Sequence, residues 1–366
     1  MQDRIDLTAE GIRLSVDLAV GHIADLVVTR EGRSLSSLHR APWISEDMAP
    51  ETDPHLTRLS GDFLCAPFGL SDVEPSPSHG WPANAPWRFL GSENLPGGVV
   101  ARFELTRTVM GARIVKEFTL RDGHPFLYQR HVFSGGAGAV SVGLHMMLSL
   151  PQGARLSFSP KLFAETPAVA LEPDPARGRS RLAYPAHFED LTQAPLADGG
   201  RADLTRYPFA AAHEDFVMLV EEPGERLAWG AALRRQEGDI TLSLKAPSDF
   251  PLTLLWFSNG GRDYAPWNGR HRGVLGMEEA RTFSLSGHAA SIRPNPLSDR
   301  GIPTSISLEE GGTVDLRQVI GLVPAPDGWE RVAGVSAVGN ELLVEGPGGQ
   351  TIRVPYDAGF LVGLRG

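Results

Sequence analysis

The chain has 366 residues, of which 42% are hydrophobic and 21% charged, so its composition supplies a packed core and excludes wholesale disorder. The formal net charge is −10, which argues against a general nucleic-acid binder or a protein of anionic membrane surfaces, because both depend on an excess of lysine and arginine. We therefore expect neither nucleic acid nor membrane among its partners.

The start of the chain and its cysteine content indicate a reducing compartment. Residues 1–6 are charged and lack the apolar segment of a signal peptide. No apolar run reaches the roughly 18 residues that a membrane-spanning helix needs. Cys65 is the single cysteine, so no disulfide can form within the chain, and we interpret it as a small buried hydrophobe. The expected location is the cytoplasm.

The hydrophobic pattern predicts an all-β protein. The chain contains 41 glycines and 29 prolines, which suits many short strands joined by turns. Residues 11–28 alternate and turn at Gly21, which predicts two strands. Between residues 99 and 150, four segments at hairpin spacing predict an antiparallel meander. Further strands are expected at 216–220, 227–233, 240–244, 252–257, 305–308, 314–320, 341–345, 350–354 and 360–364.

The domain organisation is expected to be simple. Residues 151–210 are weakly periodic and predict long loops with one short strand near 156–158. The chain contains no internal repeat of fixed period. We predict a large antiparallel β-sandwich over residues 1–324, with the strands of 325–366 as an appendage of the same domain.

Residues 78–88 combine a histidine, His79, with two tryptophans, Trp81 and Trp87. The segment also contains Gly80 and two prolines, and this mixture of permissive and fixed backbone predicts a rigid loop. The two indole rings either close the end of a sandwich or stack on a sugar ring, with the histidine reaching the sugar hydroxyls. Binding groups concentrate on loops of this kind.

The predicted strand at 140–150 carries a histidine on its less apolar face. Side chains alternate between the two faces of a strand. One face holds only apolar residues, and His145 lies on the other face, between Gly143 and Met147. His145 therefore either projects into the floor of a cleft or lies on a solvated face of the sheet.

Motifs of several enzyme classes are absent from the sequence. There is no His-Glu-x-x-His motif and no cysteine pair, so a zinc site of the usual spacing is not indicated. There is also no Gly-x-Ser-x-Gly elbow and no phosphate-binding P-loop. We predict a protein without metal or cofactor.

Three segments in the first half of the chain resemble the aldose 1-epimerases, the galactose mutarotases. His79-Gly80 followed by Trp87 is similar to the first histidine segment of that family. Gly143-Leu144-His145 is similar to the second histidine segment, and Pro67-Phe68-Gly69 is similar to the Pro-Phe segment ahead of the first histidine. Their order and approximate spacing match.

A fourth segment extends the resemblance to the second half of the chain. Gly276-Met277-Glu278 is similar to the strand that carries the catalytic glutamate of the family. The family usually has an arginine where this chain has Leu70-Ser71-Asp72, which indicates a distant branch. The resemblance implies a galactose mutarotase-like supersandwich, a large antiparallel β-sandwich.

The resemblance also implies an isomerase that interconverts the anomers of a sugar. Mutarotation opens and recloses a hemiacetal, with a base at the anomeric hydroxyl and an acid at the ring oxygen. By resemblance His145 is the acid, Glu278 is the base and His79 binds the sugar. Phe68 and the two tryptophans, Trp81 and Trp87, are further expected to line the substrate site.

Strand parity and an acidic segment complete the predicted site. Glu278 shares a face with Gly276, where a ligand has room, whereas Glu279 shares a face with Met277. Asp215 belongs to an acidic segment ahead of a strand and resembles the carboxylate of the family that binds sugar hydroxyls. Alternatively, Asp215 caps the strand.

Two other classes of function stay open. A carbohydrate-binding sandwich without catalysis predicts that His145 and Glu278 do not converge on one pocket. A sugar lyase or hydrolase on the same scaffold would need another acid pair near His79, or a metal. In each case the expected partner is a small neutral carbohydrate, and the protein is expected to be a monomer or a homodimer.

Overall fold

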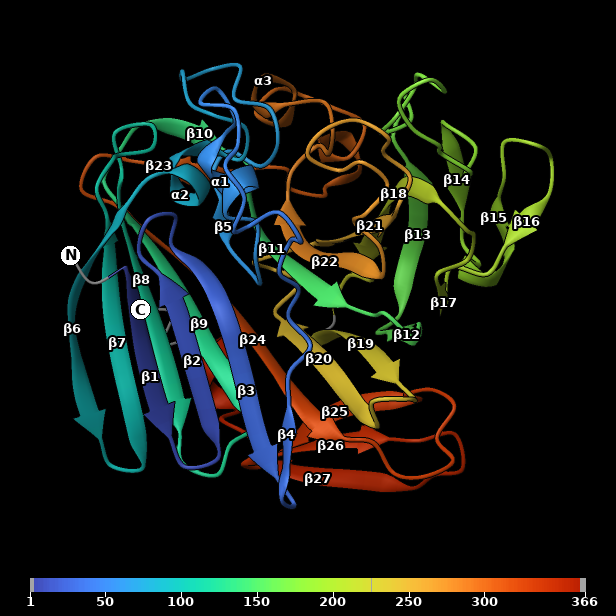
Figure 1. Ribbon diagram of the computed structural model, residues 1–366. Helices are drawn as coiled ribbons and strands as arrows, with labels where there is room; N and C mark the ends of the chain where they lie inside the picture. Colours follow the sequence, from blue (N-terminus) through green and yellow to red (C-terminus); the bar gives the residue numbers. More distant parts are fainter. Residues whose placement is uncertain (1–2, 225, 363–366) are drawn as a thin grey trace.

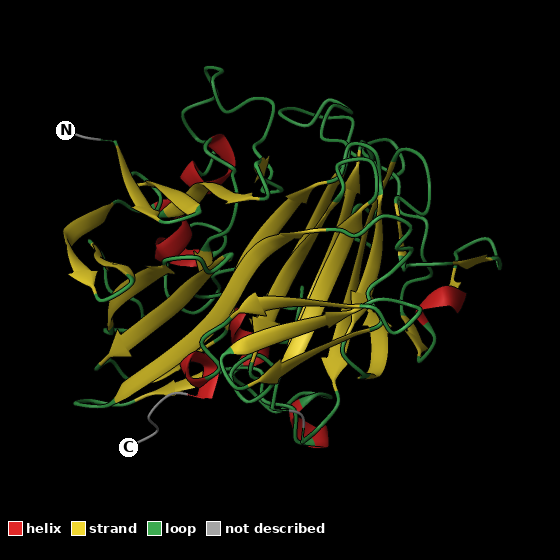
Figure 2. Cartoon of the chain, turned by 90° about the horizontal axis from the view of Figure 1, so that it is seen from below, coloured by secondary structure: helices red, strands yellow, loops and turns green. Residues whose placement is uncertain are grey.

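Antiparallel strands dominate the computed structural model, which describes residues 3–224 and 226–362 (Figure 1). All strand pairings inside its two largest sheets are antiparallel. The described helices are single turns at the periphery, as Figure 2 shows. The prediction of an all-β fold with a large antiparallel β-sandwich is therefore confirmed.

One layer of the sandwich is a sheet in which seven described strands pair. In spatial order these strands are β14 (Ala186–Phe188), β13 (Lys161–Thr166), β18 (His213–Glu221), β21 (Leu252–Asn259), β22 (Val274–Arg281), β11 (Val142–Ser149) and β5 (Leu64–Cys65). Its central strands are buried along almost their whole length. A strand covered on both faces loses the alternation of a half-exposed strand.

The other layer is a sheet in which nine described strands pair. In spatial order these strands are β17 (Arg206–Tyr207), β12 (Ala154–Phe158), β19 (Ala228–Arg234), β20 (Asp239–Lys245), β24 (Thr313–Pro324), β9 (Phe126–Ser134), β8 (Arg113–Arg121), β7 (Gly98–Leu105) and β6 (Trp87–Leu95). Strands β7, β8 and β9 form three of the four strands of the predicted meander, with β6 added before them and β24 paired to β9. The fourth predicted strand, at 140–150, contains β11 and belongs to the seven-stranded sheet instead.

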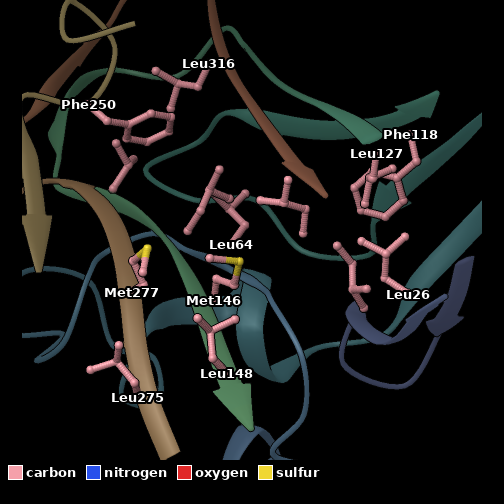
Figure 3. Packing of buried hydrophobic residues seen from close by; sticks show 14 of the residues in the cluster. Leu26, Leu64, Phe118, Leu127, Met146, Leu148, Phe250, Leu275, Met277 and Leu316 are labelled. Atoms are coloured by element: carbon pink, nitrogen blue, oxygen red, sulfur yellow. The ribbon is translucent and has the colours of Figure 1, made fainter. Parts of the chain in front are cut away.

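A third sheet covers part of the nine-stranded sheet at the start of the chain. It consists of β1 (Arg4–Ala9), β2 (Ile12–Asp17), β3 (His22–Arg30) and β4 (Arg33–Leu35). Leucines of this sheet share one hydrophobic core with both large sheets. Figure 3 shows part of that core, in which Leu26, Phe118 and Met146 come from three different sheets.

The residues after 324 form another small sheet. Its strands are β25 (Gly334–Val338), β26 (Glu341–Glu345) and β27 (Thr351–Pro355), drawn in red at the bottom of Figure 1. Leu342 and Val354 of this sheet pack with Leu242 and Val323 of the nine-stranded sheet in a separate hydrophobic cluster. The division of the chain into a sandwich up to residue 324 and an appendage stays a prediction.

The remaining described elements are short. Two pairs of strands, β10 (Gly138–Val140) with β23 (Ile306–Leu308) and β15 (Ala194–Pro195) with β16 (Arg201–Ala202), lie outside the main sheets. The α-helices are α1 (Pro54–Thr57), α2 (Gly80–Asn84), α3 (His288–Ser291) and α4 (Gly359–Val362), and the 3₁₀ helices are η1 (Leu191–Gln193) and η2 (Ser298–Arg300). None of the described helices has the length and apolarity that crossing a membrane requires.

Residues 151–210, predicted as long loops with one short strand, contain the six strands β12 to β17. Two shorter segments also differ from their predictions. The strand predicted at 360–364 is the helix α4 up to Val362, and its last two residues lie outside the described residues. The loop predicted at 78–88 contains the helical turn α2 and the first two residues of β6. In both segments a few apolar and small residues fit a helical turn as well as an extended chain, so short-range pattern does not decide between them.

Candidate active site

His145 and Glu278 lie side by side in the middle of the seven-stranded sheet. Strands β11 and β22 pair in a register that sets these two residues opposite each other. His145 Nε2 lies 3.3 Å from Oε1 of Glu278, and both side chains are buried. Opposite residues of an antiparallel pair share one face of the sheet. The fold therefore brings together the two residues that the sequence singled out for acid–base chemistry.

Neither residue satisfies the hydrogen-bonding needs of the other. The 3.3 Å contact lacks hydrogen-bond geometry. Both carboxylate oxygens of Glu278 and Nδ1 of His145 are buried without a hydrogen-bond partner among the residues that the structure describes. Buried polar groups almost always have a partner, and exceptions call for an explanation. A ligand with hydroxyl groups would supply the missing partners.

Gly276 explains how the carboxylate of Glu278 fits into the wall. A Cβ atom at Gly276 would lie 2.4 Å from Oε1 of Glu278 and 3.0 Å from Cβ of Trp256. The space beside Gly276 that strand parity assigns to a ligand is therefore partly filled by the Glu278 carboxylate itself.

His79 approaches this pair from the residue before α2. Its φ of 65° is uncommon for a residue other than glycine. Gly80 follows with a φ of +73°, and a Cβ atom there would lie 1.9 Å from the carbonyl oxygen of Ala66, so only glycine fits. Nδ1 of His79 accepts the backbone N–H of Gly69 at 3.3 Å, which leaves the ring proton on Nε2. The ring centroids of His79 and His145 are 5.2 Å apart.

A third histidine, His55 of α1, also lines the site, and the sequence analysis missed it. The amide of Asn84 donates to the carbonyl oxygens of Ser78 and Gly80, so its oxygen is an acceptor. That oxygen lies 3.0 Å from Nδ1 of His55, which must therefore donate. His55 is left with an acceptor at Nε2, and its ring centroid lies 5.1 Å from that of His79.

These side chains enclose a cavity of about 350 Å³. Its polar lining consists of His55, Ser78, His79, His145, Arg262 and Glu278. Most of the remaining lining is apolar and consists of Leu56, Leu59, Phe63, Phe68, Leu70, Leu171, Phe216, Trp256, Trp267 and Leu285. A concave, mostly apolar pocket with a few convergent polar groups is typical of a small-molecule site.

Aromatic rings surround the imidazole of His145. Phe63 stacks on it with 4.7 Å between ring centroids, and Phe68 lies nearly parallel at 6.3 Å. Trp256 meets the imidazole edge-on at 5.7 Å. Phe68 thus lies in the cavity wall, where the sequence analysis placed it. The rings fix the orientation of His145 and keep water away from it.

Arg262 supplies a cation to the cavity wall. Its guanidinium lies 4.6 Å from the ring centroid of Trp267 and 5.7 Å from that of Trp256. Its Nε donates to Glu172 at 2.6 Å, and Glu214 lies 3.5 Å from its Nη1. The arginine is therefore held between two indole rings and two carboxylates.

Burial sets the charge state of the central pair. Desolvation, together with the nearby Asp62 and Glu279, raises the pKa of Glu278 well above its ordinary value of 4.5. Desolvation lowers the pKa of His145 from 6.5 to about 3. Burial also lowers the pKa of His79 well below 6.5. At mildly acidic pH the carboxyl of Glu278 is therefore protonated, and the imidazoles of His79 and His145 are neutral.

The two tryptophans of the predicted site do not line the cavity, so this part of the prediction is wrong. Trp87 is 2% exposed, and its Nε1 donates to the carbonyl oxygen of Pro82 at 3.0 Å. The Trp81 ring packs against the main core with Arg107 over it at 5.0 Å. The helical turn of α2 is the reason, because it directs Trp81 away from His79.

We expect Trp87→Ala to lower the free energy of unfolding by about 3–5 kcal/mol, since it empties a large buried volume. Ligand affinity of the folded protein should stay unchanged. Denaturant unfolding and calorimetric titration check the two halves of this expectation. A variant of full stability that has lost ligand affinity would restore Trp87 to the binding site.

Asp215 also lies away from the cavity, which corrects its predicted role. It is fully buried and accepts hydrogen bonds from the backbone N–H groups of Arg181 and Leu182 and from the hydroxyl of Tyr184. The register of β18 with β21 sets Glu214, not Asp215, on the face of the sheet that carries Trp256. Asp215 instead fastens the 181–184 segment to β18.

Part of the site carries no recognisable signal in the sequence. The face on which Trp256 lies could have been predicted, because alternation along a strand puts Trp256 and Leu254, two residues apart, on the same face. Phe63, Arg262 and Trp267 lie outside the named strands and helices, and His55 lies on the single-turn helix α1. No periodicity of the sequence indicates where these four side chains point. Within the described residues, no group of three or more histidine, cysteine, aspartate or glutamate side chains is arranged to hold a metal ion.

Comparison with known proteins places the fold. No protein-family model and no curated protein sequence matches the chain. A solved structure of a proposed aldose 1-epimerase from Escherichia coli K12 matches with a TM-score of 0.57 and 14% identity, over 88% of this chain and 99% of that one. A proposed mutarotase from Salmonella typhimurium matches with a TM-score of 0.54 and 12% identity, over 88% and 92%.

A galactose mutarotase related enzyme from Lactobacillus acidophilus matches with a TM-score of 0.51 and 10% identity, over 88% of this chain and 98% of that one. The shared architecture is the antiparallel β-sandwich of mutarotase-like proteins. The chain therefore has the galactose mutarotase-like fold, as the sequence resemblance implied.

Proposed function

We propose that the protein is an aldose 1-epimerase-like isomerase that interconverts the anomers of a free sugar. The observation that carries the proposal is the convergence of His79, His145 and Glu278 on one cavity of a mutarotase-like fold. The fold by itself does not determine an activity. The site supports the proposal because its two unsatisfied titratable groups suit a reaction that needs one acid and one base.

The central pair works as a unit that holds one proton. One member protonates the ring oxygen while the other removes the proton of the anomeric hydroxyl, and the C1–O5 bond breaks to give the open-chain aldehyde. Rotation about C1–C2 exposes the other face of the aldehyde, and reclosure returns both protons. Each group ends in its starting state, so no cofactor is consumed. Nε2–H of His79 is suited to stabilise negative charge that develops on a substrate oxygen.

The directions of the two pKa shifts favour Glu278 as the member that holds this proton at mildly acidic pH. Because burial favours neutral forms, the protonated carboxyl of Glu278 faces the neutral imidazole of His145. This is the reverse of the roles implied by resemblance, in which His145 is the acid. We therefore assign the acid and base roles to the pair as a whole, because its two members titrate as one coupled system. Either member can act on the ring oxygen of the sugar, and the other member then acts on the anomeric hydroxyl.

The site favours this function over the two alternatives. A binding module has no need for a buried acid–base pair in the floor of its groove, because both groups are costly to bury. A two-carboxylate hydrolase needs a second acid facing the first. Among the described residues that line the cavity, Glu278 is the one carboxylate.

A panel of free aldoses tests the proposal. A pure α-anomer is dissolved, and its optical rotation is followed with increasing amounts of protein. We expect the first-order rate to rise linearly with protein concentration for at least one aldose, above the spontaneous rate. Calorimetric binding of an aldose without any acceleration would assign the protein to the carbohydrate-binding class.

A further inference from the structure

Two exposed apolar side chains line the cavity, and two more lie close to its lining residues in the sequence. Leu70 is 60% exposed and Leu285 is 42% exposed, and both line the cavity. Val73 and Val169, which are 40% and 60% exposed, lie within three residues of the lining residues Leu70 and Leu171. These are four of the eight large hydrophobic side chains that are exposed in the described part of the chain. Exposed apolar side chains that line a cavity favour a ligand with an apolar part.

The two leucines of this rim belong to segments that are fastened together. The carbonyl oxygen of Leu70 accepts the N–H of His288 at 3.1 Å, and Oδ1 of Asp72 accepts the N–H of Ala289 at 2.8 Å. Leu285 has a φ of 59°, which is unfavourable for leucine and persists only where its surroundings impose it. The exposure of both side chains is therefore built into the structure.

The cavity is thus polar at its floor and apolar at its mouth. His145 and Glu278 come from the sheet itself, whereas Leu70, Leu171 and Leu285 come from loops above it. An unsubstituted hexose carries hydroxyl groups on every side, and its outer end would leave these leucines in contact with polar groups. An amphiphilic ligand matches the gradient better.

We propose that the substrate is a free aldose that carries an apolar substituent on a carbon remote from C1. This inference rests on the proposed isomerase function, which requires a free anomeric hydroxyl, so the substituent cannot be at C1. The anomeric centre lies at the His145–Glu278 pair, and the substituent leaves the cavity across Leu70 and Leu285.

Two hexyl ethers test this proposal, namely 3-O-hexyl- and 6-O-hexyl-D-glucose, with D-glucose as the reference sugar. Burial of each methylene group tightens binding by roughly fourfold. We therefore expect calorimetry to give at least one ether a Kd about tenfold or more below that of D-glucose. The double variant Leu70→Ser/Leu285→Asn should remove this advantage, so that the ethers and D-glucose bind the variant with equal Kd values, and asparagine tolerates the positive φ at position 285.

Leu90→Ser is the matched control, because Leu90 is also 42% exposed but lies on β6, outside the cavity lining. This variant should retain the full preference for the ether. Equal Kd values of the wild-type protein for the ethers and D-glucose, or a preference that survives in the double variant, would overturn the apolar subsite.

Interconversion of anomers is measured by NMR on the same samples, which separates the two claims. Preference for an ether without interconversion contradicts the isomerase and supports the subsite. Interconversion with equal affinities contradicts the subsite and supports the isomerase. No binding of any of the three sugars overturns both.

Discussion

Glu278→Gln is expected to slow the interconversion of anomers by about 10²–10⁴-fold, the usual contribution of a positioned acid–base group. Glutamine retains the size and hydrogen-bonding capacity of the protonated carboxyl but cannot exchange a proton with a substrate oxygen. Substrate affinity should change little, because the lost interaction belongs to the transition state. The rate is read from the anomeric proton signals, and the affinity from calorimetry.

Stability gives this prediction an independent check. The carboxylate of Glu278 is buried without a hydrogen-bond partner in the described structure, so its ionisation opposes folding. Its pKa is raised in the folded state, so wild-type stability falls as pH rises from about 4.5, the ordinary value, toward the folded pKa. Glu278→Gln has no such loss and should unfold at the same or a higher temperature at pH 7. A variant that loses activity through unfolding would not fit the account.

Glu279→Gln is the matched control, and it should show the opposite pattern. Glu279 points to the other face of β22, where it contacts Lys245 and accepts hydrogen bonds from Ser243 and Thr253. Breaking a buried ion pair costs about 3–5 kcal/mol, and Lys245 keeps a second partner in Glu221. We expect a loss near the lower end of that range, with a nearly normal rate per folded molecule. A slower reaction of Glu279→Gln without a loss of stability would show that Glu279, and not Glu278, faces the cavity.

The pH dependence of kcat/KM is the second prediction with a large effect. The reaction needs one acid and one base, so the His145–Glu278 pair must hold a single proton. That form exists above the lowered pKa of His145, about 3, and below the raised pKa of Glu278. We expect a plateau in the mildly acidic range and a tenfold fall per pH unit once the pH exceeds the Glu278 pKa.

The direction in which kcat/KM changes with pH distinguishes the paired mechanism from a mechanism that uses the Glu278 carboxylate alone. If the ionised carboxylate acted with a neutral His145 and no other proton, kcat/KM would rise with pH through the raised pKa of Glu278 instead. Initial rates across pH 4–10, corrected for the spontaneous reaction at each pH, decide between the two. A flat profile through that range would mean that neither residue titrates during the reaction.

The alternation of side chains along each strand predicted the correct face for His145 and for Glu278. It could not predict that the two residues lie opposite each other. Alternation on β11 and β22 separates His145 from Leu144 and Glu278 from Glu279, because the side-chain period of a strand is two. The pairing of β11 with β22 joins residues more than 130 positions apart, as His145 and Glu278 are. Only the order of the family-like segments hinted that both residues belong to one site.

The errors in the predicted site come from places where alternation is missing. His213, Glu214 and Asp215 are all buried, so the sequence pattern of β18 could not show which of the two acids faces Trp256. Residue type was equally misleading for Trp87, since a tryptophan that fills a core and one that stacks on a ligand look the same in a sequence. His55 owes its position to long-range contacts such as its hydrogen bond with Asn84.

Magnetisation transfer between the two anomeric protons of a free aldose at equilibrium tests the central claim most directly. Binding alone cannot transfer magnetisation from one anomer to the other, so the measurement separates an isomerase from a sugar-binding protein. The account predicts transfer that grows with the concentration of wild-type protein and disappears in the well-folded Glu278→Gln variant. Equal transfer with wild-type protein, with the variant and with no protein, for an aldose that demonstrably binds, would contradict it.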